Sequence, residues 1–151
     1  MPRRGLIPRD GWKIVRVSSE AAGNGKLAKH VIDGEPRTHW HTRFGDETAK
    51  HPHELLIDMG AVHEVRGFVY LARQDQGWNG ALAKCEFFVG DSAQDLGKRG
   101  EPAARATFGK DKSPQRVTCA TVKGRYVLLR VLSEVNGGPW ASVAEFAVVG
   151  K

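Results

Sequence analysis

The chain has 151 residues, a length that suits one domain and allows a sizeable core without disulfide or metal staples. It contains 23 Lys and Arg against 17 Asp and Glu, for a formal net charge of +6, but the basic residues are scattered along the sequence. We therefore expect a solvated basic surface and no nucleic-acid partner. No apolar run approaches the length of a bilayer span, so we also expect no membrane insertion.

The first ten residues are basic and contain Pro2, Gly5 and Pro8, a composition that predicts a flexible tail over residues 1–10. We expect a single domain over residues 11–151. No apolar segment follows the opening Met-Pro-Arg-Arg, so the sequence predicts no signal peptide in this chain. The start resembles the middle of a longer protein, and we expect this chain to be one module of a larger one.

The apolar pattern favours strands throughout. Short β-branched and aromatic runs, separated by Gly, Pro and Asn turns, predict about eight main strands. They cover residues 12–17, 53–60, 65–71, 84–89, 103–108, 115–122, 125–132 and 143–149. Residues 27–32 are expected to form one helical turn. The fold class predicted is all-β, a two-sheet sandwich or jelly roll.

The two cysteines, Cys85 and Cys119, both fall in strand-like apolar stretches. Buried free thiols, which pack as small hydrophobes, are the expectation, and a disulfide between them is left open. Neither cysteine has a partner at metal-ligand spacing.

The stretch from His30 to Phe44 organises the chain. It begins with an apolar pair, turns through Asp-Gly and Glu-Pro, and ends in aromatic and imidazole side chains. Asp33, Glu35 and Thr38 offer hard oxygens within one short loop, which suits a calcium-type cation better than zinc or magnesium. His41 and Phe44 follow at once, so one loop could hold an ion and build a ligand surface beside it.

Three ordered motifs make the chain resemble a known family. They are Asp-Gly-x-Pro-x-Thr-x-Trp-His-Thr-x-Phe at residues 33–44, Tyr-Leu-Ala-Arg-Gln-Asp at 70–75 with Asn79-Gly80, and Ser-Glu-Val-Asn-Gly-Gly-Pro-Trp-Ala-Ser at 133–142 with Ala144-Glu145. In this order they resemble the discoidin-like domains, also called coagulation factor 5/8 type C domains, and are closest to family 32 carbohydrate-binding modules. The resemblance extends over nearly the whole chain, from residue 12 to residue 149.

The resemblance implies a discoidin or galactose-binding-like jelly roll whose loops gather at one end. It implies a non-catalytic module that recognises terminal galactose-type or N-acetylhexosamine-type sugars on glycans. It also implies that the backbone carbonyls of His30 and Ala144, with the Glu145 carboxylate, complete a structural calcium site. As part of an exported protein, such a module is expected in an extracellular or periplasmic location.

The residues themselves support a sugar site. His41, Arg73 and Asn79 combine hydrogen-bond donors and acceptors, as sugar hydroxyls require. The rings of Phe44, Trp78 and Trp140 lie in loop contexts and could stack on the C–H face of a pyranose. Glu20 lies near a position where some of these modules carry an acidic ligand. Trp12 and Trp40 are expected in the core.

Other functions have weaker support in the sequence. His39, His41, His51 and His53, with Asp58, could bind zinc, but no third motif completes that site. The chain contains no recognisable nucleophile motif, phosphate-binding loop or metalloprotease motif, so we expect no enzyme activity. The alternative function is an adhesion or membrane-binding discoidin domain that contacts lipid headgroups or a protein partner.

Overall fold

The structure is a computed structural model that describes residues 5–151, and strands dominate it. The strands are β1 (Lys13–Val17), β2 (Trp40–His41), β3 (His53–Leu71), β4 (Lys84–Gly90), β5 (Ala104–Thr107), β6 (Gln115–Val131), β7 (Ser142–Val143) and β8 (Glu145–Gly150). Three single-turn 3-10 helices, η1 (Ala22–Asn24), η2 (Ala28–Ile32) and η3 (Gly45–Glu47), lie between the first strands. The helical turn predicted at residues 27–32 is confirmed as η2.

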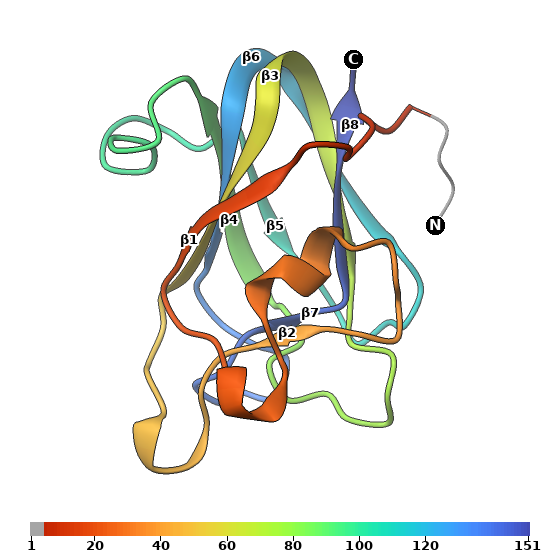
Figure 1. Ribbon diagram of the computed structural model, residues 1–151, viewed down its shortest axis with the longest axis vertical. Coiled ribbons are helices and arrows are strands. Elements are labelled where there is room, and N and C mark those ends of the chain that lie inside the picture. The colour runs from red at the N-terminus through yellow and green to blue at the C-terminus, as the bar shows by residue number, and fades with distance from the viewer. Residues whose placement is uncertain (1–4) are drawn as a thin grey trace.

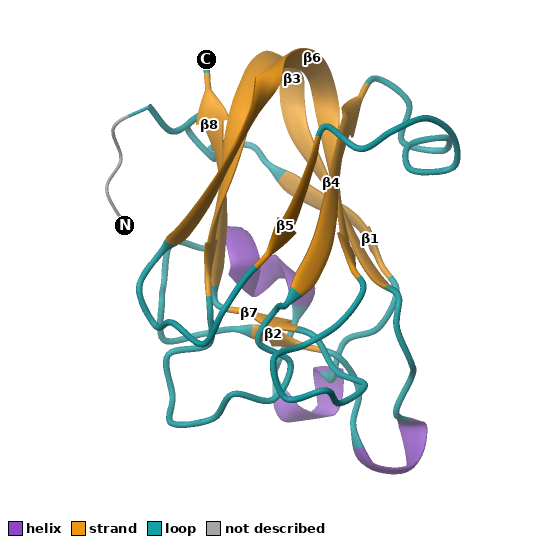
Figure 2. Ribbon diagram, turned by 180° about the vertical axis from the view of Figure 1, so that it is seen from behind, coloured by secondary structure: helices purple, strands orange, loops and turns teal. Residues whose placement is uncertain are grey.

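Two long strands form both layers of the fold. The first half of β3 pairs with β1 on one side and with the C-terminal half of β6 on the other. The second half of β3 pairs with β8 and with the N-terminal half of β6. Both strands bend as they run, and Figures 1 and 2 show them arching together over one end of the molecule. The predicted all-β sandwich is confirmed.

Aromatic rings from the two layers meet in the core. Phe68 of β3 stacks on Phe87 of β4 with ring centroids 4.6 Å apart, and Phe146 of β8 lies 6.2 Å from both. All three rings are almost fully buried, so burial of their apolar area contributes strongly to stability. Trp12 and Trp40 are buried as predicted, and the Trp40 indole N–H donates to the Ser19 carbonyl at 2.8 Å.

The strand boundaries differ from the predicted ones in three places. The segments 53–60 and 65–71 belong to one strand, β3, and the segments 115–122 and 125–132 belong to β6. The glycines in these segments predicted strand ends. Gly60 instead adopts a positive φ of 81°, which lets β3 bend while its pairing with the neighbouring strands continues. The predicted strand 143–149 is divided at Ala144 into β7 and β8.

The predicted flexible tail is wrong for residues 5–10, while residues 1–4 lie outside the described part of the chain. Ile7 is only 2% exposed, and its N–H donates to the Val148 carbonyl at 2.9 Å. Leu6 forms an isolated bridge with Val149. Leu6 and Ile7 thus pair with the edge of β8, and the flanking Gly5 and Pro8 are compatible with an extended edge segment.

The loops that carry the family motifs gather at one end. β2 pairs with β7 there, and η1 and η3 lie beside them, while the C-terminus lies at the opposite end (Figures 1 and 2).

Within the described residues, no helix is long and apolar enough to cross a membrane. Both cysteines are free thiols; Cys85 is buried, as predicted, whereas Cys119 is only half-buried.

Candidate functional site

A cavity of about 270 Å³ opens at the loop end of the sandwich. It brings together residues from four segments that are distant in the sequence. Its lining residues are Lys26, His39, His41, Phe44, Arg73, Asn79 and Trp140. Five of the seven predicted sugar-binding residues therefore share one cavity, and the exceptions are Glu20 and Trp78.

His41 lies in β2 and lines the cavity. Its N–H donates to the Lys26 carbonyl, its own carbonyl accepts from Ala21, and the side chain is 6% exposed. The Nδ1 atom lies 2.6 Å from the Thr42 carbonyl, which can only accept, so Nδ1 carries the proton. Burial lowers the pKa of His41, so the ring is neutral at pH 7 and leaves Nε2 as an acceptor.

Arg73 is fixed by a carboxylate on its own loop. Its Nε and Nη2 donate to the two oxygens of Asp75, both at 2.7 Å, and its Nη1 donates to the Asn79 carbonyl at 3.0 Å. The guanidinium lowers the pKa of Asp75 well below its usual range, so the pair is charged at neutral pH. Because Asp75 occupies the Nε and Nη2 edge of the guanidinium, the remaining N–H groups of Nη1 and Nη2 are held in one orientation.

Asn79 lies on a turn that fits closely against the last loop. The Asn136 amide donates to its side-chain oxygen at 3.1 Å, and the Ser142 hydroxyl donates to its carbonyl at 2.9 Å. The next residue, Gly80, has a φ of +85°, and a Cβ there would lie 2.7 Å from the backbone of Ala141 and Ser142. Glycine is therefore required at position 80, because any side chain there would collide with the backbone of the last loop.

Glu134 ties these loops together, although sequence reasoning gave it no special role. Its buried carboxylate accepts backbone N–H groups from Gly80 at 3.0 Å, Trp140 at 3.3 Å and Asn136 at 3.2 Å. Hydrogen bonds from several amides to one carboxylate are charge-assisted and strong. Glu134 thus positions Trp140 and the Asn79 turn without lining the cavity itself.

Two aromatic rings border the polar residues of the cavity. The Phe44 ring is 44% exposed and meets His41 edge-on with centroids 5.2 Å apart. The Trp140 ring lies 6.3 Å from His41 and is half-buried. The cavity therefore offers an apolar face beside hydrogen-bonding groups.

Two lining residues, His39 and Lys26, were not predicted as sugar ligands. Burial is the main cause that lowers the pKa of His39 to about 4, with help from Arg73 and Lys26, so the ring is neutral at pH 7. Side chains two residues apart in an extended segment point to the same side, so His39 lines the cavity together with His41. This spacing is the sequence feature from which His39 could have been predicted as a lining residue. The buried His39 Nε2 and Trp140 Nε1 atoms have no hydrogen-bond partner among the described residues. A ligand hydroxyl could satisfy such atoms.

Trp78 and Glu20 lie outside the cavity. Trp78 packs under Lys112, whose ammonium lies 3.9 Å from the ring centroid and also donates to the Arg73 and Gly77 carbonyls. This contact is a structural cation–π interaction that holds the Arg73 loop. One Glu20 oxygen accepts the Ala28 N–H at 2.7 Å, and the residue lines a neighbouring cavity instead.

The predicted ion loop gathers only part of its ligand set. Thr38 Oγ1 donates to Asp33 Oδ2 at 2.6 Å, and the His30 ring lies 3.1 Å from the same oxygen. The Glu35 carboxylate turns away and pairs with Arg37, which lowers the pKa of Glu35 to about 2. The Glu35 side chain therefore does not join Asp33 in this structure.

Glu145 shows an orphaned buried oxygen. Its Oε2 accepts from Arg9 Nη1 at 2.5 Å, whereas its Oε1 is buried without a hydrogen-bond partner among residues 5–151. Burial raises the pKa of Glu145, the Arg9 guanidinium offsets part of that rise, and the nearby Asp33 carboxylate adds to it. Two carboxylates that repel one another, one with an unsatisfied oxygen, suit a hard cation. Ala144, next to Glu145, is fully buried.

The histidines do not form a zinc site with Asp58. His53 Nε2 lies 2.6 Å from the Pro139 carbonyl, and Asp58 is paired with Arg125 at 2.8 Å. Across the part of the chain that the structure describes, no group of three or more His, Cys, Asp and Glu side chains converges as a metal site.

The chain is similar to known proteins over most of its length. The F5/8 type C domain family matches residues 14–146. A galactose oxidase from Gibberella zeae is 32% identical over 148 residues, 97% of this chain and 21% of the relative. A sialidase from Micromonospora viridifaciens is 33% identical over 149 residues, 97% of this chain and 22% of the relative. The chain thus spans about a fifth of the length of these curated relatives.

Solved structures share the fold over nearly the whole chain. A Clostridium perfringens module, CpGH89CBM32-5, in complex with GalNAc-β-1,3-galactose is 26% identical with a TM-score of 0.84. The superposition covers 96% of this chain and 99% of that one. The family 32 module of NanJ from the same organism, in complex with galactose, is 23% identical with a TM-score of 0.78, covering 95% and 97% of the two chains.

Proposed function

The chain belongs to the F5/8 type C domain family, and from this we propose that it is a non-catalytic carbohydrate-binding module. The observation that carries the proposal is the cavity itself. It places His41, Arg73 and Asn79 beside the Phe44 and Trp140 rings, at the loop end of the sandwich. Its polar groups both donate and accept hydrogen bonds, and its rings supply apolar area.

The protonation states in the cavity match a neutral polyol. Arg73 donates, the neutral His41 accepts through Nε2, and the Asn79 side-chain amide can do both. A pyranose also presents C–H groups, which would bury apolar area against the exposed Phe44 ring. The ring is smaller than an indole, so we expect modest stacking energy.

We propose galactose-type or N-acetylhexosamine-type sugars at glycan ends as the ligand class. Support comes from CpGH89CBM32-5, whose structure holds GalNAc-β-1,3-galactose and which resembles this chain at 26% identity. Matched relatives include a galactose oxidase and a sialidase, in which the matching region is a small part of the protein. We propose that this module, too, is part of a larger protein, and that this larger protein is exported.

A structural calcium ion is part of the proposal. Asp33, Thr38 and Glu145 would hold it, with the carbonyls of His30 and Ala144, whereas Glu35 would contribute no side-chain oxygen. The support is the orphaned Glu145 oxygen next to a second carboxylate. Such an ion would tie the first loop to the last strand and so hold His41 in place.

Calorimetry with free sugars tests the proposed ligand. Galactose or N-acetylgalactosamine should bind with a Kd on the order of 0.1–1 mM, because one small ligand makes few contacts. Glucose serves as the matched non-ligand, since it differs from galactose at a single hydroxyl. An absence of binding to both galactose-type sugars in calorimetry and on a glycan array would refute the proposal. Release of product from aryl galactosides would refute its non-catalytic part.

The alternative, adhesion to lipid headgroups, has less support. Among residues 5–151, the large apolar side chains that are exposed are Val15, Phe44, Val62 and Leu132. They come from β1, the η3 loop, β3 and the end of β6, and Phe44 is the member that lines the cavity. Vesicle sedimentation separates the two functions, since a lipid-binding module would sediment with liposomes free of glycolipid.

A further inference from the structure

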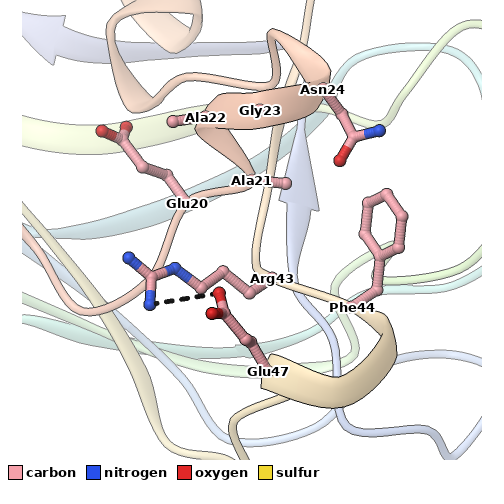
Figure 3. A pocket seen from close by; sticks show the side chains of 8 residues that line it. All are labelled: Glu20, Ala21, Ala22, Gly23, Asn24, Arg43, Phe44 and Glu47. Atoms are coloured by element: carbon pink, nitrogen blue, oxygen red, sulfur yellow. Dashed lines mark ion pairs between the residues drawn. The ribbon is translucent and has the colours of Figure 1, made fainter.

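A second cavity lies beside the sugar cavity, and the two share Phe44 as a wall. Its volume is about 240 Å³, close to that of the first. Its lining residues are Glu20, Ala21, Ala22, Gly23, Asn24, Arg43, Phe44 and Glu47. Figure 3 shows the Asn24 amide and the Phe44 ring on one side, with Arg43 and Glu47 on the other.

The backbone fixes the second cavity relative to the first. Ala21 pairs with Lys26 in an isolated bridge around η1, and the Ala21 N–H donates to the His41 carbonyl at 2.8 Å. The His41 N–H in turn donates to the Lys26 carbonyl. The Arg43 N–H donates to Ser19 Oγ at 2.9 Å, anchoring the opposite wall. The turn between Ala21 and Lys26 therefore borders both cavities, because Lys26 lines the first cavity and Asn24 lines the second.

The side chains of the second cavity are polar and available to a ligand. The Arg43 and Glu47 charges are 3.6 Å apart, with 57% and 74% of their side chains exposed, so their mutual attraction is weak. Either group can therefore turn toward a bound molecule. Two carboxylates, one guanidinium and one amide disfavour an anion and suit a neutral ligand with many hydroxyls.

We propose that the second cavity binds the adjacent sugar residue of a glycan whose terminal residue occupies the His41 cavity. The inference rests on the proposed function, because it extends the same ligand by one residue. The exposed Phe44 ring lies between the cavities and would contact both residues of the disaccharide. Asn24, Arg43 and Glu47 would bind hydroxyls of the second residue.

Calorimetry with paired ligands tests this inference. The probes are galactose, N-acetylgalactosamine, lactose and GalNAc-β-1,3-galactose. At least one disaccharide should bind about tenfold more tightly than the monosaccharide at its non-reducing end, as expected for a few added hydrogen bonds. In the double variant Asn24→Ala/Glu47→Ala this gain should disappear while monosaccharide affinity is retained.

Asp46→Ala is the matched control, because Asp46 lies in η3 next to Glu47 but does not line the cavity. It should keep the tenfold gain. An amide NMR titration adds a second measurement that needs no substitution. The disaccharide should shift the Gly23 and Asn24 amide signals, whereas the monosaccharide should leave them nearly unchanged.

The outcomes separate this inference from the proposed function. If monosaccharides bind but no disaccharide binds more tightly, the second cavity has no such role and the proposed function stands. A gain that persists in the double variant, without shifts at Gly23 and Asn24, overturns the inference in the same way. If no sugar binds at all, the proposed function fails and this inference fails with it.

Discussion

Removing the Glu134 carboxylate should both destabilise the domain and disable the cavity. The Glu134 oxygens accept three backbone N–H groups from Gly80, Asn136 and Trp140. Gly80 is buried, so its N–H would lose its partner without gaining water, whereas Asn136 is exposed and its N–H can be solvated. Trp140 is intermediate between these cases. Counting the Gly80 bond in full and about half of the Trp140 bond, we expect Glu134→Ala to cost about 2–4 kcal/mol.

Glu134→Gln separates the charge from the acceptor. Its remaining carbonyl oxygen can face Gly80 and Trp140, while the new amide group faces the solvated Asn136 side. We therefore expect a smaller loss, about 1–2 kcal/mol, because one acceptor and the charge assistance are lost. Both variants should weaken galactose binding, since Trp140 and the Asn79 turn lose their common anchor.

Urea denaturation measures the stability of each variant, and calorimetry measures its affinity for galactose. Glu101→Ala is the control, because the Glu101 side chain is 81% exposed and pairs only with the exposed Arg105 side chain. It should change stability by less than about 0.5 kcal/mol. The reasoning is refuted if Glu134→Ala costs less than about 1 kcal/mol or retains wild-type affinity, since Glu134 would then not organise the loops.

Further predictions concern the Asn-Gly turn, pH and the ion. Gly80→Ala should cost at least about 1–3 kcal/mol and weaken sugar binding, because its φ of +85° and the 2.7 Å approach leave no room for a methyl group; Gly109→Ala, which meets nothing within 4 Å, is the control in urea denaturation. The pKa of His39 is lowered to about 4 in the folded state, so folding disfavours protonation of this ring. The neutral ring therefore contributes about 3 kcal/mol to the free energy of unfolding above pH 6.5, and this contribution is lost as the pH falls toward 4. His39→Gln should flatten that part of the stability profile, and an unchanged profile would contradict the assignment. Chelation should lower the Tm, and calcium but not magnesium should restore it; an unmoved melting curve, together with no calcium in purified protein, would refute the ion site.

The strands and most of the residues that line the cavity could be predicted because their signals are local. Alternating apolar runs gave the strands, and the motifs around His41, Arg73 and Asn79 marked the loops that the fold gathers at one end. Trp78 does not line the cavity because its ring packs against Lys112, a contact between residues 34 positions apart that no local pattern reveals. Glu20 lines the neighbouring cavity instead, and one of its carboxylate oxygens accepts the Ala28 N–H, a contact that its local sequence does not reveal.

Other features depend on three-dimensional contacts. β3 and β6 continue through their glycines because the ladder bends, and sequence shows only a glycine that could equally end a strand. Ile7 and Arg9 bind β8 and Glu145, so the predicted tail is fixed by partners more than 130 residues away. The role of Glu134 likewise appears only when Gly80 and Trp140 are brought to it by the fold.

The most direct test of the central claim is galactose binding by Arg73→Ala, compared with wild type and with Arg105→Ala. Arg73 lines the cavity, whereas Arg105 lies on β5 with an exposed side chain that pairs with Glu86 and Glu101. We predict that Arg73→Ala keeps a cooperative melting transition and loses detectable galactose binding in calorimetry, while Arg105→Ala binds as wild type does. Wild-type affinity in a folded Arg73→Ala would contradict the assignment of this cavity as the carbohydrate site.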